Sequence, residues 1–210
     1  MSKLSSLDRR AFLRRASSTA FVLPLIGLGI VELTSCASAT TGSTLNPGGW
    51  KTTICPANEP GEPLIISGTI YAPDGRTPMP GITLSVYQTD ASGVYSTKNG
   101  EDQRNTRLNG KMFSNAQGKY EFRTIKPGSY PGSKNPAHIH AYMSGPGYPE
   151  YWIDEFHFTD DPFISDEDKQ KAAVRGSFSS ILKLTRDSDG ILRGVRDITV
   201  ERCSRNCTGK

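Results

Sequence analysis

Two of the chain's three histidines lie one residue apart, in the segment NPAHIHAYM at positions 135–143. A β-strand directs alternate side chains to opposite faces, so a strand here would aim His138 and His140 in the same direction. Neutral imidazole is the commonest protein ligand for metal ions. The spacing therefore indicates a metal site, although two polar residues on the solvent face of a strand would give the same pattern.

Two tyrosines precede this pair, each in a segment with turn-forming residues. Tyr95 follows QTDASGV, and Tyr130 lies between two Pro-Gly pairs in GKYEFRTIKPGSYPG, at positions 118–132. This order of motifs resembles the intradiol ring-cleavage dioxygenases, the catechol and protocatechuate 3,4-dioxygenase family. The resemblance covers about residues 60 to 165, and it is specific because four potential ligands occur in the family's order within matching local motifs.

The resemblance implies that Tyr95, Tyr130, His138 and His140 bind one non-haem Fe(III) (Fe(3+)), with no organic cofactor. Two tyrosinates supply hard anionic oxygens, and coordination lets phenols lose their protons far below their free pKa of about 10. The implied reaction uses O2 to cleave a catechol-type ring between its two hydroxyl-bearing carbons, giving a muconate-type dicarboxylic acid. The position of Tyr130 corresponds to the ligand that substrate displaces, so its freed phenolate would accept a substrate proton.

One catalytic position departs from the family's pattern. Many members have an arginine immediately before P-A-H-I-H, where this chain has Asn135. The arginine is thought to stabilise negative charge on the bound substrate, and asparagine cannot supply a cation. We therefore expect Arg123, Lys126 or Lys134 to replace it, or the activity to be weaker or directed to another substrate.

A second departure follows the histidine strand. The family often shows a T-Q-x-Y-F-type element, and this chain reads DEFHF at positions 154–158. Glu155 is therefore expected to bring an extra carboxylate near the site. For His157 we favour a structural polar residue beside Phe156 and Phe158 over a metal ligand.

Short segments with strand-like alternation dominate the rest of the chain, separated by Gly, Pro, Asn and Asp. They predict an all-β fold, an antiparallel β-sandwich (prealbumin-like) with one short helix and long active-site loops. The helix is expected from Ser165 as N-cap to Gly176 as stop. The polar segment 96–117 is expected to form a long loop. The predicted strands lie in residues 64–71, 82–88, 118–125, 137–143, 152–158, 177–184 and 190–200.

The first 35 residues have the layout of an export signal, with DRRAFLRR, a short apolar stretch and LTSC. Arg9-Arg10 resembles a twin-arginine signal, and LTSC resembles a bacterial lipobox whose Cys36 would carry lipid. We expect an exported periplasmic or cell-surface lipoprotein, or alternatively a soluble secreted protein. The predicted order is a signal at 1–35, a flexible tether at 36–62, the dioxygenase-like domain at 63–202 and a C-terminal tail at 203–210.

Charge and cysteines limit the partners. Of 25 basic and 21 acidic residues, 20 and 19 remain without the signal, so the charge does not favour nucleic acid.

With Cys36 lipidated, an oxidising compartment favours one disulfide among Cys55, Cys203 and Cys207, in a pairing that spacing does not define. The chain lacks the long N-terminal helical segment that dimerises catechol 1,2-dioxygenases, so we expect a monomer or simple homo-oligomer.

Two other functions are compatible with these patterns. The strand segments also resemble transthyretin-like and carboxypeptidase-regulatory modules, which favours a noncatalytic β-sandwich that binds a polymer or partner at the cell surface. Such modules have no need of H-x-H with two placed tyrosines. The histidine pair alone is also compatible with zinc or copper. An Fe(III) dioxygenase acting on a small catechol-type molecule and O2 remains the leading hypothesis.

Overall fold

The structure is a computed structural model that describes residues 49–201. The predicted signal, Cys36 and the whole predicted tail with Cys203 and Cys207 lie outside the described residues, and Cys55 is buried. Within the described range, no helix has the length and apolar character needed to cross a membrane.

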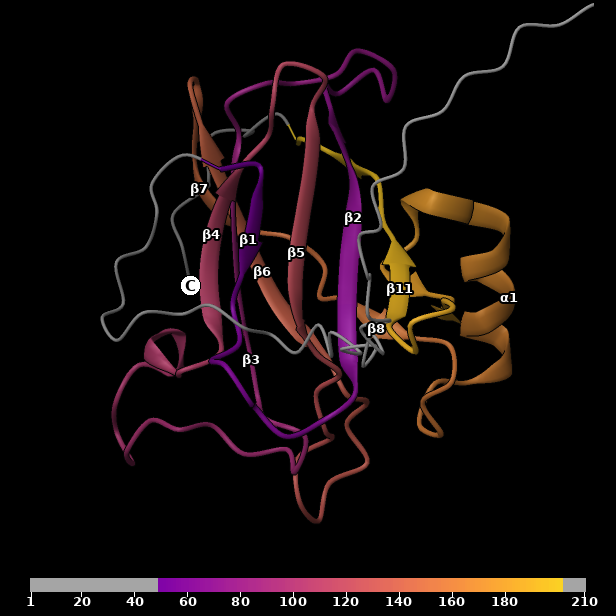
Figure 1. Cartoon of the computed structure of the whole chain (residues 1–210). Coiled ribbons are helices and arrows are strands. Elements are labelled where there is room, and N and C mark those ends of the chain that lie inside the picture. The colour runs from indigo at the N-terminus through magenta and orange to yellow at the C-terminus, as the bar shows by residue number, and fades with distance from the viewer. Residues whose placement is uncertain (1–48, 202–210) are drawn as a thin grey trace, which may run out of the picture. The chain divides into compact units, whose positions relative to one another are not determined.

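Two β-sheets form the two layers of a sandwich (Figure 1). The larger sheet has the order β1-β5-β2-β11-β10, with β12 also pairing with β2. The smaller sheet has the order β4-β3-β6-β7, and β8 pairs with β9 separately. The strands are β1 (Lys51–Thr53), β2 (Pro63–Tyr71), β3 (Thr83–Gln88), β4 (Asn109–Phe113), β5 (Lys119–Ile125), β6 (Ile139–Gly145), β7 (Tyr148–Trp152), β8 (His157–Phe158), β9 (Ile181–Leu182), β10 (Thr185–Arg186), β11 (Leu192–Val195) and β12 (Ile198–Thr199).

The all-β sandwich is confirmed, but its larger sheet is mixed. The smaller sheet is antiparallel throughout, as predicted. By contrast, three pairs in the larger sheet are parallel: β1 with β5, β11 with β2, and β12 with β2. Parallel neighbours require a crossover rather than a tight hairpin, and β11 and β12 reach β2 only after the helical segment of the chain.

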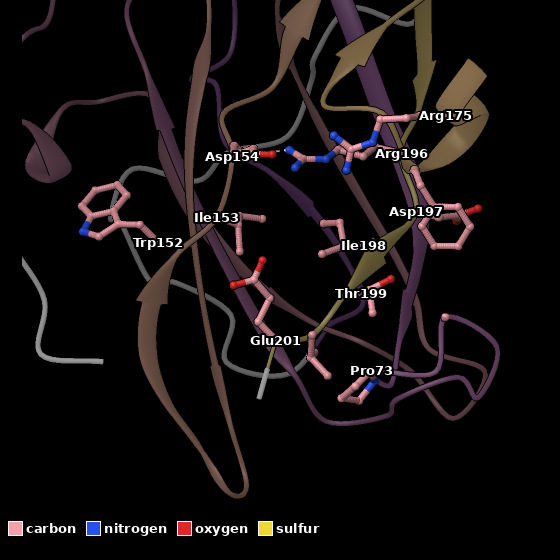
Figure 2. Close-up of a pocket in the computed structure, with 13 residues that line it drawn as sticks. Pro73, Trp152, Ile153, Asp154, Arg175, Arg196, Asp197, Ile198, Thr199 and Glu201 are labelled. Carbon is pink, nitrogen blue, oxygen red and sulfur yellow. Dashed lines mark hydrogen bonds between the residues drawn. The ribbon is translucent and has the colours of Figure 1, made fainter. Parts of the chain in front are cut away.

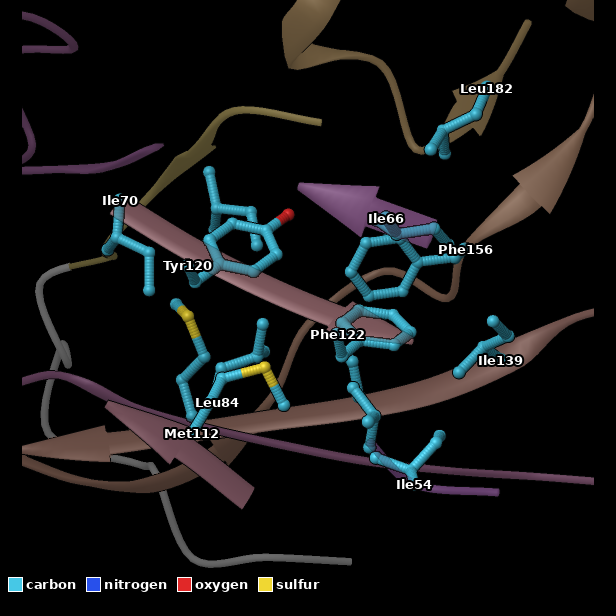
Figure 3. Close-up of a cluster of buried hydrophobic side chains, with 14 of the residues drawn as sticks. Ile54, Ile66, Ile70, Leu84, Met112, Tyr120, Phe122, Ile139, Phe156 and Leu182 are labelled. Atoms are coloured by element: carbon cyan, nitrogen blue, oxygen red, sulfur yellow. The ribbon is translucent and has the colours of Figure 1, made fainter. Parts of the chain in front are cut away.

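Apolar side chains that alternate with polar ones fill the space between the sheets (Figure 3). Ile66 and Phe122 face inward from the larger sheet and Leu84 from the smaller one, all fully buried. Phe156 stands edge-on to Phe122, with ring centroids 5.7 Å apart. Because Ile139 of β6 is also fully buried, strand alternation directs the neighbouring His140 to the outer face of the smaller sheet.

The predicted helix is confirmed as α1 (Asp166–Arg175). Ser165 caps it, since its Oγ accepts a hydrogen bond from the Asp168 backbone N–H at 3.1 Å. Gly176 ends it with a φ of 58°. Two short 3-10 helices complete the described elements, η1 (Gln103–Asn105) and η2 (Gly176–Phe178).

The predicted tether is wrong for residues 49–62, which belong to the domain. Lys51–Thr53 form β1, and the buried side chain of Ile54 joins the core. Glu59 forms an ion pair with Arg107 at 2.6 Å. The Gly-, Pro- and Ser-rich composition concealed a strand whose pairing partner, β5, is distant in the sequence.

Two loops leave the same end of the sandwich and carry the predicted tyrosines. The Tyr95 loop (residues 89–108) follows β3, and the Tyr130 loop (residues 126–138) follows β5. The fully buried Gln88 links their starting points: its Nε2 donates to the Ile125 carbonyl at 2.9 Å, and its Oε1 accepts from Thr124 Oγ1 at 2.9 Å.

The two loops then approach each other so closely that only glycine fits. The backbone N–H of Gly128 donates to the Asp90 carbonyl at 2.9 Å, and the Gly128 carbonyl accepts from Thr89 Oγ1 at 3.0 Å. A Cβ on Gly128 would lie 2.5 Å from the Ala91 carbonyl oxygen. A Cβ on Gly93 would lie 1.9 Å from the Ser129 carbonyl oxygen. These contacts fix one loop against the other.

We predict that Gly128→Ala lowers the free energy of unfolding by about 1–3 kcal/mol, because the added methyl group forces the loops apart. Urea denaturation monitored by circular dichroism measures this change. Gly132→Ala in the same loop is the control: its Cβ meets no atom within 4 Å, so only its φ of 73° is strained. That strain costs about 1 kcal/mol. A Gly128→Ala protein as stable as the wild type would contradict the close approach.

Candidate metal centre

Four side-chain atoms from three segments converge on one point. The phenol oxygens of Tyr95 and Tyr130 lie 2.9 Å apart. The Tyr130 oxygen lies 3.1 Å from His138 Nε2 and 3.4 Å from His140 Nε2. The two Nε2 atoms are 3.2 Å apart. The structure thus brings together all four residues that the sequence marked as metal ligands.

Outer partners orient both imidazole rings. His138 Nδ1 lies 2.7 Å from the Pro136 carbonyl oxygen, and His140 Nδ1 lies 2.6 Å from Glu155 Oε1. Both oxygens accept hydrogen bonds, so each Nδ1 carries the proton and each Nε2 presents a lone pair. The two lone pairs then face the same point from 3.2 Å apart. Without a shared proton or cation they would repel each other.

The donor set fits a metal ion. Two ligand atoms bound about 2.1 Å from one ion, at roughly right angles to each other, lie about 3 Å apart. The four atoms here are separated by 2.9–3.4 Å along every measured pair. Two oxygens that become anionic, together with two neutral nitrogens, suit a hard, highly charged ion such as Fe(III).

The phenols need such a cation in order to ionise. Burial, followed by the hydrogen bond to Tyr130, raises the pKa of Tyr95 well above its ordinary value. Burial also raises the pKa of Tyr130, with a further contribution from the nearby Glu155 charge. Desolvation disfavours the phenolate, so both hydroxyls hold their protons until a positive charge offsets that penalty.

A turn, rather than a strand, places Tyr95. The strand β3 stops at Gln88, seven residues before Tyr95. Asp90 Oδ1 accepts the backbone N–H groups of Ser92 at 2.9 Å and Val94 at 3.1 Å. This side-chain-stabilised turn reverses the chain and brings Tyr95 against Tyr130.

A buried carboxylate, which the sequence did not single out, anchors the histidine segment. Asp161 is 5% exposed, and its Oδ2 accepts the backbone N–H of Ala137 at 2.9 Å. Its Oδ1 accepts the Phe163 N–H at 2.8 Å. Asp161 therefore fixes the backbone directly before His138. Its neighbour Asp160 is also an aspartate, and the sequence offers no signal that distinguishes the two.

Aromatic rings surround the cluster on the outer face of the smaller sheet. Tyr87 stacks on His140 with ring centroids 4.5 Å apart and an interplanar angle of 21°. Burial raises the pKa of Tyr87 to about 12, so this phenol stays neutral. Trp152, which is 43% exposed, stands edge-on to both Tyr87 and His140. The rings of Tyr87 and Trp152 therefore flank His140.

Glu155 lies near the site, as expected, but on the outer side of His140. Its ligand atom and those of the two histidines all lie within 4.8 Å of one another. Because Oε1 already contacts His140 Nδ1, Glu155 orients a ligand rather than sharing the point that the four atoms face. Its Oε2 is 3.7 Å from Nε2 of His157, whose ring centroid lies 5.8 Å from that of His138.

Two of the three expected substitutes for the family's arginine, Arg123 and Lys126, are held away from the cluster. Arg123 lies between the buried Phe122 and Thr124, so strand alternation places it on the outer face of the opposite sheet. Lys126 pairs with Asp160 at 2.6 Å. Lys134 and Asn135 lie in an exposed turn, where the Asn135 N–H donates to Ser133 Oγ. The prediction of a substitute cation is wrong for Arg123 and Lys126, which other contacts hold elsewhere.

A larger cavity lies apart from this cluster. Its volume is about 980 Å³, and Figure 2 shows Arg196, Asp197, Ile198 and Thr199 along its wall. None of the four converging residues lines it. The candidate metal centre is therefore a separate site.

Comparisons with known proteins agree with this fold. A family model described as dioxygenase matches residues 49–196. The chain is 30% identical over 143 residues to catechol 1,2-dioxygenase 1 of Acinetobacter lwoffii, an alignment that covers 60% of this chain and 45% of that relative. It is 29% identical over 116 residues to the protocatechuate 3,4-dioxygenase beta chain of Burkholderia cepacia, covering 50% and 48% of the two chains.

The chain thus spans about half the length of these curated relatives. A solved structure with the same fold is the dioxygenase domain of a dioxygenase carbohydrate-binding protein fusion from Streptomyces sp. SirexAA-E. It has a TM-score of 0.55 and 24% sequence identity, and the match covers 80% of this chain and 98% of that one. Since the family match takes in most of the chain, and its relatives are named as catechol and protocatechuate dioxygenases, the chain belongs to the intradiol ring-cleavage dioxygenases, a family of oxidoreductases.

Proposed function

We propose that the chain is an Fe(III)-dependent enzyme that cleaves a catechol-type ring between its two hydroxyl-bearing carbons, using O2, to give a muconate-type dicarboxylic acid. The observation that carries this proposal is the convergence of two phenol oxygens and two imidazole Nε2 atoms within 3.4 Å contacts. The names of the relatives, catechol 1,2-dioxygenase and protocatechuate 3,4-dioxygenase, support the substrate class.

The four residues would have different roles in the reaction. Tyr95, His138 and His140 would hold ferric iron, which when bound supplies the Lewis acidity and electron-accepting capacity that catechol oxidation by O2 needs. Tyr130 has the central oxygen, within 3.4 Å of the other three atoms. It comes from a loop, whereas His140 lies on a strand. We assign to Tyr130 the role of the ligand that gives way to the substrate and whose oxygen accepts a substrate proton.

We also propose that the protein is exported through residues 1–35 and anchored by lipid on Cys36. The twin-arginine and lipobox-like sequences support this proposal. A folded metalloenzyme that acquires iron before export fits the twin-arginine route. The chain would act as a monomer or simple homo-oligomer on a small molecule, with no nucleic-acid partner.

We predict that the protein purified after iron-replete expression is coloured, because two tyrosinates bound to ferric iron absorb visible light. Anaerobic addition of catechol should shift that absorption. His138→Ala and Tyr130→Phe should reduce iron content and remove or alter the band. Tyr71→Phe is the matched control, since Tyr71 ends β2 in the larger sheet and its ring packs on Phe178, apart from the four-atom cluster. Colourless, iron-free wild-type protein would contradict the proposed function.

We predict that Glu155→Ala weakens iron binding about 10–100-fold, because His140 loses the acceptor that fixes its ring. Glu155→Gln should bind iron much more tightly than Glu155→Ala, since its amide oxygen can still accept the Nδ1 hydrogen bond. Competition with a coloured chelator measures both affinities. Equal losses in the two variants would show that Glu155 acts through its charge or as a direct ligand.

We predict that Cys36→Ser moves the exported protein from the membrane fraction to the soluble fraction. Several acyl chains on one cysteine give stable anchoring, and serine does not receive them. Cell fractionation followed by immunoblotting tests this, with Cys55→Ser as the control for loss of a thiol elsewhere. A Cys36→Ser protein that stays on the membrane would rule out the lipid anchor.

A further inference from the structure

The outer face of the smaller sheet continues from the metal centre to an open aromatic surface. Tyr142 pairs with Trp152 across β6 and β7, and their ring centroids lie 5.3 Å apart. Trp152 also lies 6.3 Å from His140, centroid to centroid, and remains 43% exposed. A planar molecule bound at the centre would therefore have rings beside it, on a side open to solvent.

Carboxylates border this aromatic surface. Glu150 precedes Trp152 by two residues on β7, where the pairing with β6 shifts register, and its side chain is exposed. Its Oε1 lies 3.7 Å from Nη1 of Arg104, which the Tyr95 loop extends toward β7. The same guanidinium is held more tightly by Asp102, with Nη2 to Oδ2 at 2.6 Å. We use the name acidic wall for the surface formed by Tyr142, Trp152, Glu150 and Asp102.

The charge of this region is negative on balance. Three carboxylates border it, those of Asp102, Glu150 and Glu155, while Arg104 is the one guanidinium that contacts them. Arg104 is already engaged by two of these carboxylates, so its charge is offset. Asn135 adds no charge. A carboxylate brought here would meet repulsion from these carboxylates, and neither Arg123 nor Lys126 is placed to offset it.

We infer that the acidic wall receives the substituent of the substrate and selects catechols that carry an ammonium group over catechols that carry a carboxylate. The inference rests on the proposed function. Ammonium groups are attracted to the faces of Trp and Tyr rings and to carboxylates, and the wall presents both. An uncharged catechol is neither attracted nor repelled by the wall, so its affinity lies between those of the other two catechols.

Three probes test this inference in the iron-loaded protein: catechol, 4-(2-aminoethyl)catechol and 3,4-dihydroxybenzoate. The chain has two tryptophans, so Trp50→Phe leaves Trp152 as the reporter of binding by fluorescence in the absence of O2. Oxygen consumption gives kcat/KM in parallel. We expect the amine to bind at least about tenfold more tightly than the carboxylate at low salt, with catechol between them, and the difference to shrink as salt rises.

Glu150→Lys provides the charge test without touching a proposed ligand. It exchanges one negative charge of the acidic wall for a positive one, and we expect the amine-to-carboxylate ratio of affinities to fall about fivefold or more. Glu167→Lys is the matched control. Glu167 is an exposed carboxylate on α1 that pairs with Lys171, and Figure 1 shows α1 at the opposite edge of the sandwich from β7. This variant should leave the ratio unchanged.

The outcomes separate this inference from the proposed function. If catechol is cleaved but the carboxylate binds as tightly as the amine, the acidic wall does not select the substituent and the inference is overturned. An equal effect of Glu150→Lys and Glu167→Lys would overturn it too, because the preference would then reflect overall charge. If none of the three diols binds or is consumed, the proposed function fails and this inference fails with it.

Discussion

Two imidazole lone pairs that face each other at 3.2 Å repel each other unless a cation or a donated proton, such as that of the Tyr130 hydroxyl, lies between them. The hydrogen bonds on the far side of each ring, to Pro136 and Glu155, hold both rings in this arrangement. Two phenols whose pKa values burial raises complete the group. The fold therefore holds these groups in an electrostatically unfavourable arrangement, and binding a cation there removes the repulsion.

The sandwich and its loops contribute to the centre in different ways. The sheet sets the direction of His140 through the alternation of β6, because slipping by one residue would exchange His140 with the fully buried Ile139. The tyrosines have no such constraint, since both lie on loops. Their positions depend on close glycine contacts between the loops, so a small loop displacement would separate Tyr95 from Tyr130 while the sheets stayed intact. His140 on a strand and the other three residues on loops suit the ligand exchange proposed for Tyr130.

Local patterns were enough to predict much of this structure. Alternation identified β2, β3, β5 and β6, Ser165 and Gly176 marked the ends of α1, and the motif order identified the four converging residues. The prediction of a loop over 96–117 is wrong for residues 109–113, which form β4 and pair with β3. The features that the sequence did not give depend on distant partners. The parallel pairing of β1 with β5 joins residues that lie 70 positions apart, as the contact of Lys51 with Glu121 illustrates. Asp161 likewise acts on Ala137 from 24 positions away, and no local pattern encodes such a contact.

Glu155 links the chemistry of the centre to the charge of its surroundings. Its hydrogen bond to His140 needs only an acceptor, which an amide would also supply. A carboxylate does more, because an N–H that donates to an anion makes the opposite nitrogen a stronger donor to a metal. The same negative charge adds to those of Asp102 and Glu150, and in a site without the family's arginine it has no free cation to offset it. Ligand strength and substrate charge preference are therefore coupled through one residue, which explains why the two departures from the family's pattern, at Asn135 and Glu155, change the charge of the site in the same direction.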